Sequence, residues 1–367
     1  MSSRTIVIKL GSSTVTGPDG RVDVAYLSSL AGQVARVRES GDRVVVVTSG
    51  AIAAGVDALG LASRPSDMPG LQAAASVGQV RLIGAYKQAF SEAGIPTGQV
   101  LLTRHELGHR PSYVNACQTL ERLLGMGVVP VVNENDTTAV DEIRMGDNDQ
   151  LAALVGIMVQ ADLVALLTDT EGLYSSDPRT DEDASLVARV ETLTDDVVAA
   201  AGGSGSDVGS GGMATKLEAA RVAMKAGIPL VVCDGHRPDV VVDAAAGEPV
   251  GTYFCEGAES IAGRKLWIAY GSPVKGTVEI DDGARDALCS RGKSLLPAGV
   301  VATSGSFAAG DAVDLVDARG KVVARGLSAI SREDLDRVKG MKTSEISKMI
   351  PDWDGGEVVH RDCLVIL

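Results

Sequence analysis

Short apolar runs alternate with longer amphipathic stretches over the first two thirds of the chain. Continuous runs rich in Val, Leu and Ile predict strands that are buried on both faces, and apolar residues at helical spacing predict the helices between them. The predicted strands cover residues 5–10, 43–50, 98–103, 128–135, 161–169 and 229–235. The predicted helices cover residues 24–41, 71–94, 112–127, 148–160 and 214–229. This alternation predicts an α/β fold, a mostly parallel sheet sandwiched by helices, with ligand-binding residues at the carboxyl ends of its strands.

The pattern changes after about residue 260, where short β-type runs alternate with frequent glycine turns. These runs cover residues 274–288, 294–307, 310–327 and 357–367. Several short strands separated by turn residues are typical of a small, separate β-rich domain. We therefore predict two domains, residues 1–260 and 275–367, with a junction in residues 262–276.

The composition of the chain is that of a globular, acidic protein. Of its 367 residues, 45% are hydrophobic and 22% are charged, and the net charge is -14 at pH 7. An acidic balance opposes nonspecific binding to nucleic acid or to anionic membranes. No apolar stretch is long enough to span a bilayer, and the N-terminal apolar run is too short for a signal peptide. Five scattered cysteines without metal-ligand spacing are typical of reduced thiols, so we predict a cytoplasmic protein.

Glycine and serine dominate residues 204–216, where Lys216 lies just inside a predicted helix. The segment is not a P-loop, because its lysine follows Thr215 rather than a glycine. Glycines let the backbone approach an anion, and a helix N-terminus adds positive potential. Lys216 opposes the helix dipole at this position, so local stability does not explain it. Two interpretations stay open at this point: a phosphate cradle, or a solvent loop with a stray lysine.

Two strand ends carry further candidate residues. Lys9 lies inside the apolar first strand, where its charge is costly unless it has a partner. The alternative is that Lys9 reaches solvent from an edge of the sheet. Ser49, Gly50 and Ala51 lie between the second strand and a predicted helix, so they form either a simple turn or a cradle for phosphate or carboxylate.

Carboxylates and amides crowd the segment after the fourth predicted strand. A set of carboxylates this dense repels itself unless cations neutralise it. Three interpretations are open: recognition of a substrate amine, a metal–phosphate or lysine network, and a solvated acidic loop. The apolar strand and helix on either side hold the segment at a strand end, which weakens the third interpretation. The residues are Asn133, Glu134, Asn135, Asp136, Asp141, Glu142, Asp147, Asn148 and Asp149.

His105, Glu106 and His109 match the His-Glu-x-x-His pattern of zinc proteases only formally. That pattern needs a continuous helix to bring both histidines to one face. Because Gly108 interrupts the segment and Pro111 follows it, we predict a loop without a zinc site.

The candidate segments, taken together, resemble the amino acid kinase family in their order and spacing. They are Lys9 with Gly11-Ser12-Ser13, then TSGA, NENDT, GDND, TDTEGLY and GGMATK. The chain most resembles the members of that family that phosphorylate glutamate, and its tail resembles a PUA domain in residues 276–288 and 294–311. The resemblance covers essentially the whole chain, and NENDT, GDND and GGMATK in this order are its most specific motifs.

The resemblance implies an enzyme that uses ATP and Mg²⁺ to convert L-glutamate into L-glutamyl 5-phosphate, the first step of proline biosynthesis. It also implies a homo-oligomer and feedback inhibition by proline through the loop after Asp136. By matching motif, Lys9 and Lys216 stabilise the transferring phosphoryl group, and Asp149 orients these lysines. The residues implied to bind glutamate are Ser49, Asp136 and Asn148. The residues implied to bind ATP are Lys9, Thr168, Asp169, Ser210, Gly211, Gly212, Met213, Ala214, Thr215 and Lys216, and no side chain is implied to bind the metal.

The implied chemistry agrees with the residue types in these motifs. The nucleophile is a carboxylate, which is ionised at pH 7 and needs no general base, and the motifs contain no histidine. Phosphoryl transfer needs positioning and neutralisation of negative charge, which two lysines, a glycine-rich loop and Mg²⁺ supply. Two alternatives stay open: a kinase for another carboxylate or carbamate substrate, and an RNA-binding protein that acts through the PUA-like domain.

Overall fold

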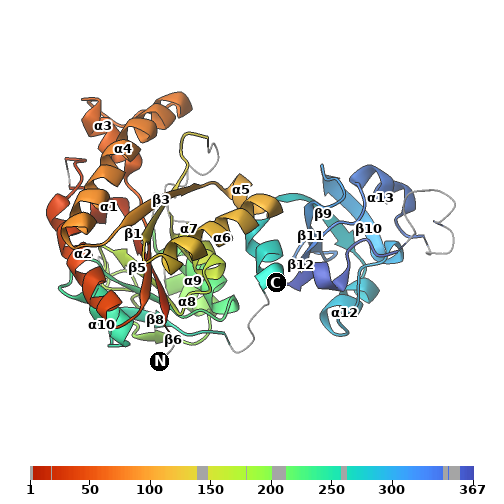
Figure 1. Ribbon diagram of the computed structural model, residues 1–367. Coiled ribbons are helices and arrows are strands. Elements are labelled where there is room, and N and C mark those ends of the chain that lie inside the picture. Colours follow the sequence, from red (N-terminus) through yellow and green to blue (C-terminus); the bar gives the residue numbers. More distant parts are fainter. Residues whose placement is uncertain are drawn as a thin grey trace. The chain divides into compact units, whose positions relative to one another are not determined.

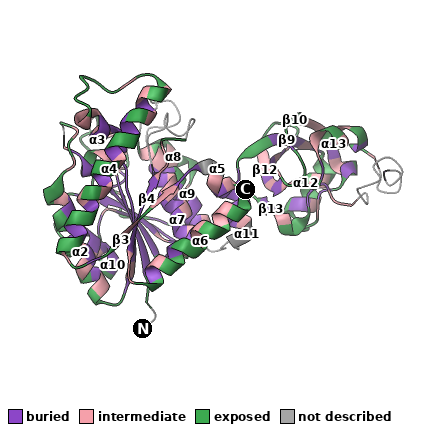
Figure 2. Ribbon diagram, turned by 45° about the horizontal axis from the view of Figure 1, so that its top comes forward, coloured by how far each residue is buried: buried purple, intermediate pink, exposed green. Residues whose placement is uncertain are grey.

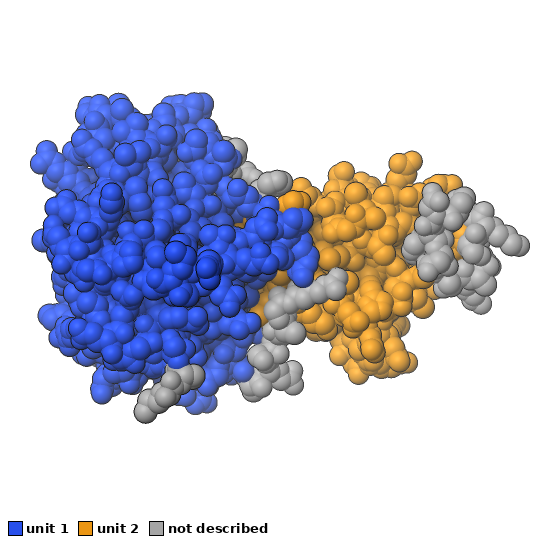
Figure 3. All heavy atoms as spheres, in the orientation of Figure 1, with its two compact units in different colours: residues 1–106, 110–260 blue, residues 107–109, 261–367 orange. Residues whose placement is uncertain are grey.

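The structure, a computed structural model, describes residues 3–17, 19–138, 148–178, 180–200, 212–257, 263–341, 346 and 356–367. The chain divides into two compact units, which Figure 3 shows in different colours. The first unit comprises Met1–Glu106 and Arg110–Ser260, and the second comprises Leu107–His109 and Ile261–Leu367. Each unit has a hydrophobic core of its own.

The first unit contains an eight-stranded sheet with the strand order β3-β4-β2-β1-β5-β7-β8-β6 (Figure 1). The strands from β3 to β7 in this order are parallel, whereas β8 runs antiparallel to β7. The strands are β1 (Thr5–Leu10), β2 (Arg43–Val47), β3 (Thr97–Leu102), β4 (Val129–Glu134), β5 (Leu163–Thr168), β6 (Arg189–Val190), β7 (Leu230–Asp234) and β8 (Thr252–Phe254). The predicted mostly parallel sheet is confirmed; the short strands β6 and β8 have no counterpart in the predicted elements.

Helices cover both faces of this sheet, with α2, α4 and α10 on one side and α6, α7 and α9 on the other (Figure 1). These helices have buried residues on the side that faces the strands and exposed residues on the other side, as Figure 2 shows. The buried residues are mostly apolar. The helices are α1 (Ser12–Val15), α2 (Val24–Glu39), α3 (Ala51–Ala58), α4 (Met68–Glu92), α5 (Arg104–Gly108), α6 (Arg110–Gly125), α7 (Asp149–Met158), α8 (Asp195–Ala200), α9 (Met213–Lys225) and α10 (Val240–Ala246).

Strand alternation determines which side of the sheet each β1 residue faces. The β1 residues in the core with α2, α4 and α10 are Ile6, Ile8 and Leu10. Val7 faces the other side, because it pairs with Val164 of β5, and Val164 lies against α7. A Cβ atom on Gly156 of α7 would come within 2.9 Å of Val164. Lys9, two residues after Val7, therefore also faces α7.

The segment that contains His105 and His109 is helical, so the predicted loop is wrong. Helix α5 covers Arg104–Gly108, and α6 begins at Arg110 after a bend at His109. Pro111 does not prevent this arrangement, because proline is tolerated in the first turn of a helix, where its missing N–H has no intrahelical partner. The Glu106 carboxylate accepts a hydrogen bond from the backbone N–H of Thr103, 2.9 Å away, which stabilises the start of α5.

The second unit contains a five-stranded sheet with the order β10-β9-β11-β12-β13 (Figure 1). The strands are β9 (Val274–Ile280), β10 (Val300–Gly305), β11 (Ala312–Val316), β12 (Val322–Leu327) and β13 (Leu364–Ile366). The predicted β-rich character of this part is confirmed. Among the described residues of this unit, the helices α11 (Gly263–Leu266), α12 (Asp282–Cys289) and α13 (Arg332–Val338) accompany the sheet. The pattern did not predict them, and the β-type run predicted over residues 274–288 is wrong in its second half, where α12 lies.

The described part of the predicted junction, residues 263–276, is folded within the second unit. After α11, a π-helical turn covers Trp267–Gly271 and buries Trp267 and Ile268. The indole Nε1 of Trp267 donates a hydrogen bond to the carbonyl oxygen of Leu107, 2.7 Å away. The segment therefore has packing and hydrogen bonds of its own rather than an extended linker conformation.

Candidate active site

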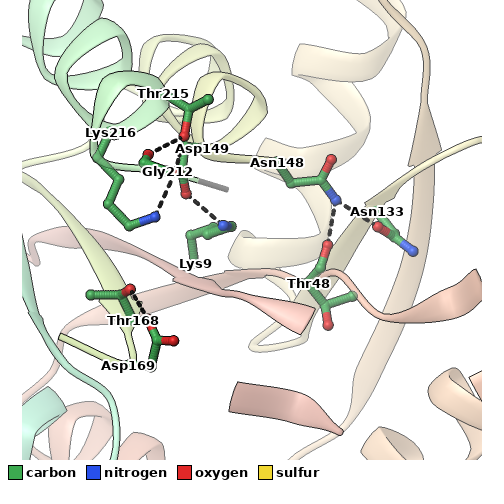
Figure 4. Close-up of polar contacts among 10 residues, drawn as sticks. All are labelled: Lys9, Thr48, Asn133, Asn148, Asp149, Thr168, Asp169, Gly212, Thr215 and Lys216. Carbon is green, nitrogen blue, oxygen red and sulfur yellow. Dashed lines mark hydrogen bonds and ion pairs between the residues drawn. The ribbon is translucent and has the colours of Figure 1, made fainter. Parts of the chain in front are cut away.

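Lys9, Asp149 and Lys216 meet at the carboxyl edge of the first sheet (Figure 4). Lys9 comes from β1, Asp149 is the first residue of α7, and Lys216 lies in the first turn of α9. The Nζ atom of Lys9 lies 2.5 Å from Oδ1 of Asp149. The Nζ atom of Lys216 lies 3.2 Å from Oδ2 of the same carboxylate. One carboxylate thus holds two lysines from distant parts of the chain.

All three of these side chains are almost completely shielded from solvent. Lys9 is 3% exposed, Lys216 is 5% exposed and Asp149 is 0% exposed. A buried ammonium group is costly without a partner, and Asp149 supplies a counter-charge to both lysines. The sheet-edge interpretation of Lys9 and the stray-lysine interpretation of Lys216 are therefore wrong. Two ammonium groups held side by side on one carboxylate form an arrangement that suits an anionic ligand.

The N-terminus of α9 lies beside this cluster. Gly212 occupies the N-cap position without a side-chain cap, so the first N–H groups, those of Met213 and Ala214, have no capping acceptor from that residue. The hydroxyl oxygen of Thr215 lies 3.0 Å from Oδ2 of Asp149 and 2.8 Å from the carbonyl oxygen of Gly212. Uncapped N–H groups and the helix dipole favour phosphate at this position.

Thr168 and Asp169 lie at the same edge of the sheet, at the end of β5. The Thr168 hydroxyl donates to Oδ1 of Asp169, 3.0 Å away (Figure 4). β5 is the direct neighbour of β1, and Lys9 pairs with Leu166, two residues before Thr168. Thr168 and Asp169, two of the residues predicted to bind ATP, thus lie next to the lysine cluster.

A pocket opens at the ends of β2 and β4, and it brings together the three residues predicted to bind glutamate. Ser49 follows β2, Asp136 follows β4, and Asn148 precedes α7. The residues that line the pocket are Ser12, Ser49, Gly50, Ala51, Ile52, Ala53, Arg64, Asn133, Glu134, Asp136 and Asn148. A polar rim with one cation and two carboxylates matches a small zwitterionic molecule.

The turn from β2 into α3 provides both a backbone cradle and a side-chain hydroxyl. Gly50 has a φ of 99°, in the left-handed region that favours glycine, and it directly precedes α3. Ser49 is buried, and among the described residues its Oγ atom has no hydrogen-bond partner. Buried hydroxyls are nearly always paired in folded proteins, so this atom is available for a ligand in the pocket.

Asp136 is half-buried, and burial raises the pKa of its carboxyl group to about 6. The positive charge of Arg64 acts in the opposite direction and lowers this pKa. A carboxylate that lacks solvation benefits strongly from a bound cation. The pair therefore offers an acceptor for an ammonium group beside a donor for a carboxylate.

Asn148 is held in the pocket by its own amide group. Its Nδ2 atom donates to the carbonyl oxygen of Thr48, 2.5 Å away, and to Oδ1 of Asn133, 2.7 Å away (Figure 4). Asn133 is 2% exposed and Asn148 is 6% exposed, so these hydrogen bonds lie away from competing water. The orientation of the Asn148 side chain is thereby determined.

Some of the predicted site residues lie outside the described parts of the chain. They are Asp141, Glu142, Asp147, Ser210 and Gly211. Among the residues that are described, no group of three or more His, Cys, Asp or Glu side chains is placed to hold a metal ion. Among the described helices, none combines the length and the hydropathy needed to cross a membrane.

Comparison with known families identifies the class of protein. Residues 4–234 match the model of the amino acid kinase family, and residues 276–350 match that of the PUA domain. The chain therefore belongs to the amino acid kinase family and carries a PUA domain, as the motifs predicted.

Within that family, the chain is similar along almost its whole length to glutamate 5-kinases. The glutamate 5-kinase of Geobacter sulfurreducens is 45% identical over 364 residues, which cover 99% of this chain and 98% of that protein. The glutamate 5-kinase of Caldanaerobacter subterraneus is 44% identical over 362 residues, which cover 99% and 97% of the two chains. Among solved structures, an isopentenyl phosphate kinase aligns with a TM-score of 0.49 and 19% identity, over 68% of this chain and 99% of that chain.

The sequence patterns missed several residues of the pocket. Arg64 lies in the loop between α3 and α4, within a polar segment that resembles any surface loop. Ser12 belongs to a recognised motif, but no pattern connected it with the end of β4. Ser12 reaches the pocket because the sheet order places β1, β2 and β4 together, whereas Arg64 reaches it from the loop between α3 and α4.

Proposed function

We propose that this site transfers the γ-phosphoryl group of ATP to the side-chain carboxylate of L-glutamate, which gives L-glutamyl 5-phosphate and ADP. The observation that carries this proposal is the cluster of Lys9, Asp149 and Lys216 beside a pocket with an ammonium acceptor. The near full-length similarity to glutamate 5-kinases supports the choice of substrate. This activity is the first step of proline biosynthesis.

Glutamate fits the pocket through the two charges of its amino-acid end. The ammonium group pairs with Asp136 and donates a hydrogen bond to the Asn148 amide oxygen, while the α-carboxylate lies near Arg64. The Ser49 hydroxyl and the N–H groups at the start of α3 provide further donors. With that end fixed, the side-chain carboxylate extends toward Lys9 at the neighbouring strand end.

In the transfer step, a side-chain carboxylate oxygen forms a bond to the γ-phosphorus. The bond between that phosphorus and the bridging oxygen to the β-phosphate breaks, and ADP leaves with the electron pair. The attacking carboxylate is already ionised near pH 7, so no proton needs to be removed. The difficulty is the electrostatic repulsion between the attacking carboxylate and the anionic phosphoryl group. Lys9, Lys216 and the α9 N-terminus reduce this repulsion by neutralising the oxygens of the transferring group.

Mg²⁺ supplies further positive charge on the ATP phosphates when it is bound. The uncapped α9 N-terminus and the two buried lysines fit a bound triphosphate. We assign the ATP phosphates as the main ligands of the metal, since Mg²⁺ is usually bound through substrate phosphates in sites of this kind.

The proposal is tested by measuring ADP release with Mg-ATP and a panel of acceptors. We expect turnover with L-glutamate to exceed that with aspartate, N-acetylglutamate and carbamate. Greater turnover with any of these three compounds would identify that compound, rather than glutamate, as the substrate. Chelation of Mg²⁺ with EDTA is expected to stop the reaction, and added Mg²⁺ is expected to restore it.

Proline is proposed to inhibit the enzyme by competing for the same pocket. It carries the same charged amino and carboxylate groups that Asp136 and Arg64 would recognise in glutamate. We expect proline to raise the KM for glutamate without a matching fall in kcat. An inhibition pattern independent of glutamate concentration would contradict a shared site.

RNA binding through the PUA domain stays a prediction that the side-chain pairing does not favour. Several arginines of this unit are paired with carboxylates, such as Arg325 with Asp314 at 2.6 Å and Arg291 with Asp286. Paired arginines contribute less positive potential to a surface. A salt-dependent gel shift of tRNA at low ionic strength would revive this alternative. The cytoplasmic location and the homo-oligomer also stay predictions.

A further inference from the structure

Three side-chain amides form a hydrogen-bonded chain that begins in the pocket and ends on helix α4. Asn148 Nδ2 lies 2.7 Å from Asn133 Oδ1, and Asn133 Nδ2 lies 2.8 Å from Gln79 Oε1. The chain is anchored at the pocket end, where Asn148 Nδ2 also lies 2.5 Å from the backbone carbonyl oxygen of Thr48. These residues come from α4, β4 and the start of α7, so they connect three separate elements.

The backbone carbonyl determines the direction of every amide in the chain. A carbonyl oxygen can only accept a hydrogen bond, so the Asn148 atom that faces Thr48 is the NH₂ group. The Asn133 atom that faces this NH₂ group is then the amide oxygen. Its own NH₂ group faces Gln79, which must therefore present its oxygen. The polarity thus follows from chemistry and does not depend on how the amide atoms are assigned.

Asn148 offers its amide oxygen to a ligand, and not its NH₂ group. Both hydrogens of its NH₂ group are used, one by Thr48 and one by Asn133. The remaining polar atom of the side chain is Oδ1, which is an acceptor only. Asn148 can therefore bind a donor such as an ammonium group, and it cannot donate to a carboxylate without breaking one of these hydrogen bonds.

Helix α4 supports both anchors of Asn148 from one face. Gln79 and Tyr86 are seven residues apart, and so lie on the same side of the helix. Gln79 accepts from Asn133, and the Tyr86 hydroxyl donates to Oγ1 of Thr48, 2.9 Å away, from a completely buried ring. The helix thereby holds the two acceptors that determine the Asn148 amide orientation.

We propose that Gln79 is a positioning residue that determines substrate choice, because it keeps the oxygen of Asn148 available to the substrate ammonium group. This proposal rests on the proposed function, since it concerns how the pocket recognises glutamate. Without the Gln79 acceptor, the Asn133 NH₂ group loses its protein partner, so Asn133 holds the Asn148 amide less firmly and the Thr48 carbonyl is left as the fixed partner of that amide. The Asn148 oxygen is then less well oriented toward the substrate ammonium group, so recognition of the amino group weakens while the phosphoryl-transfer residues stay in place.

The test compares L-glutamate with glutarate, which has both carboxylates but no ammonium group. Dissociation constants for both ligands are measured by titration calorimetry, and kcat/KM is measured for both in the ADP-release assay. In Gln79→Met, which keeps the side-chain length and removes the acceptor, we expect glutamate affinity to fall about tenfold. We expect glutarate affinity to stay unchanged, so the preference for glutamate over glutarate falls by the same factor.

Two further variants separate positioning from a structural effect. Gln79→Glu retains an acceptor for Asn133 and is expected to restore most of the preference for glutamate. Gln88→Met changes another glutamine of α4, an exposed one bonded to Glu92, and is expected to leave both ligands unaffected. Equal losses for glutamate and glutarate in Gln79→Met, or no loss for either, would overturn the proposal. Absence of glutamate phosphorylation by the wild-type enzyme would instead refute the proposed function. The binding preference for glutamate over glutarate, measured by calorimetry, would still test whether Gln79 positions Asn148.

Discussion

The Nζ atom of Lys9 lies 2.5 Å from Oδ1 of Asp149, a carboxylate with no solvent exposure. The same carboxylate holds Lys216 at 3.2 Å through its second oxygen. Asp149 therefore connects the first strand of the sheet with the N-terminus of α9, and keeps two ammonium groups at one place despite their mutual repulsion. This arrangement prepares the site for an anion before the anion arrives.

Replacement of Asp149 by Asn is expected to lower both activity and stability. Two buried ammonium groups lose their counter-charge, which costs about 3–5 kcal/mol, and kcat falls on the order of 10²-fold because the lysines lose their orientation. Saturating Mg-ATP supplies replacement negative charge, so the loss in melting temperature should be smaller with the nucleotide than without it. Thermal unfolding with and without Mg-ATP measures this difference; equal losses in both conditions would show that the phosphates do not meet the lysines.

Replacement of either lysine by Met is expected to reduce kcat on the order of 10²- to 10³-fold, because each neutralises charge that develops during transfer. The KM for glutamate should change little, since neither Lys9 nor Lys216 lines the pocket. The double variant should lose less than the product of the single effects, because the two residues act on one group. Steady-state kinetics measure these values, and Lys87→Met, on the exposed face of α4, is the matched control. Near-normal turnover of both single variants would exclude the proposed roles.

Glutamate recognition is expected to weaken as the pH falls through about 6, the raised pKa of Asp136. Protonation removes the charge that pairs with the substrate ammonium, so kcat/KM should fall about tenfold per pH unit below that value. The kcat profile should fall at a lower pH, because the bound ammonium stabilises the ionised carboxyl group. Profiles from pH 5 to 8 test this, and Asp136→Asn should lack the acidic limb.

The same carboxyl group is expected to cost stability at neutral pH. Its pKa is higher in the folded than in the unfolded chain, so the protonated form stabilises the fold and this contribution is lost as the pH rises through about 6. Asp136→Asn should therefore raise the free energy of unfolding by about 1–2 kcal/mol at pH 8 and by less at pH 5. Denaturant unfolding at the two pH values measures the difference; an equal effect at both would point to a cause other than ionisation.

Replacement of Arg64 by Gln is expected to raise the KM for glutamate about tenfold with little change in kcat, because the α-carboxylate loses its cation. The preference for glutamate over isoglutamine, whose α-carboxylate is an amide, should shrink by the same factor. Kinetics with both substrates measure it, and Arg81→Gln serves as a control, because Arg81 pairs with Asp57 on the surface. An unchanged preference would place the α-carboxylate elsewhere.

The close packing of α3 on α4 predicts opposite effects for two glycines of α4. A Cβ atom on Gly78 would lie 1.8 Å from the carbonyl oxygen of Ala51, whereas none of the described atoms lies within 4 Å of one on Gly84. Gly78→Ala should destabilise the protein by about 1–3 kcal/mol and raise the KM for glutamate, because α3 lines the pocket. Gly84→Ala should stabilise it by up to about 1 kcal/mol through helix propensity. Denaturant unfolding of both variants decides whether the two signs differ.

Much of the fold follows from local pattern. Apolar runs of strand length and helical spacing are properties of a few neighbouring residues, so β1, β2, β3, β4, β5 and β7 were predictable. The long helices between them were predictable for the same reason. The error over residues 104–111 arose because glycine and proline were interpreted as breakers, although Pro111 occupies a first-turn position where it is tolerated. The two-residue β6 is too short for any periodicity to identify it.

The site also has features that the sequence predicted and features that only the tertiary structure shows. The sequence by itself predicted, through the resemblance of its motifs to the amino acid kinase family, that one phosphoryl-transfer site contains Lys9, Ser49, Asp136, Asn148, Asp149, Thr168 and Lys216. Only the tertiary structure decided which partners stabilise the charges of these residues. Lys216 is stable against its own helix dipole because Asp149, from another helix, lies 3.2 Å away. Arg64 lines the pocket from the loop between α3 and α4, and Gln79 of α4 accepts a hydrogen bond from Asn133 of β4. Such contacts between distant segments leave no periodic trace in the sequence.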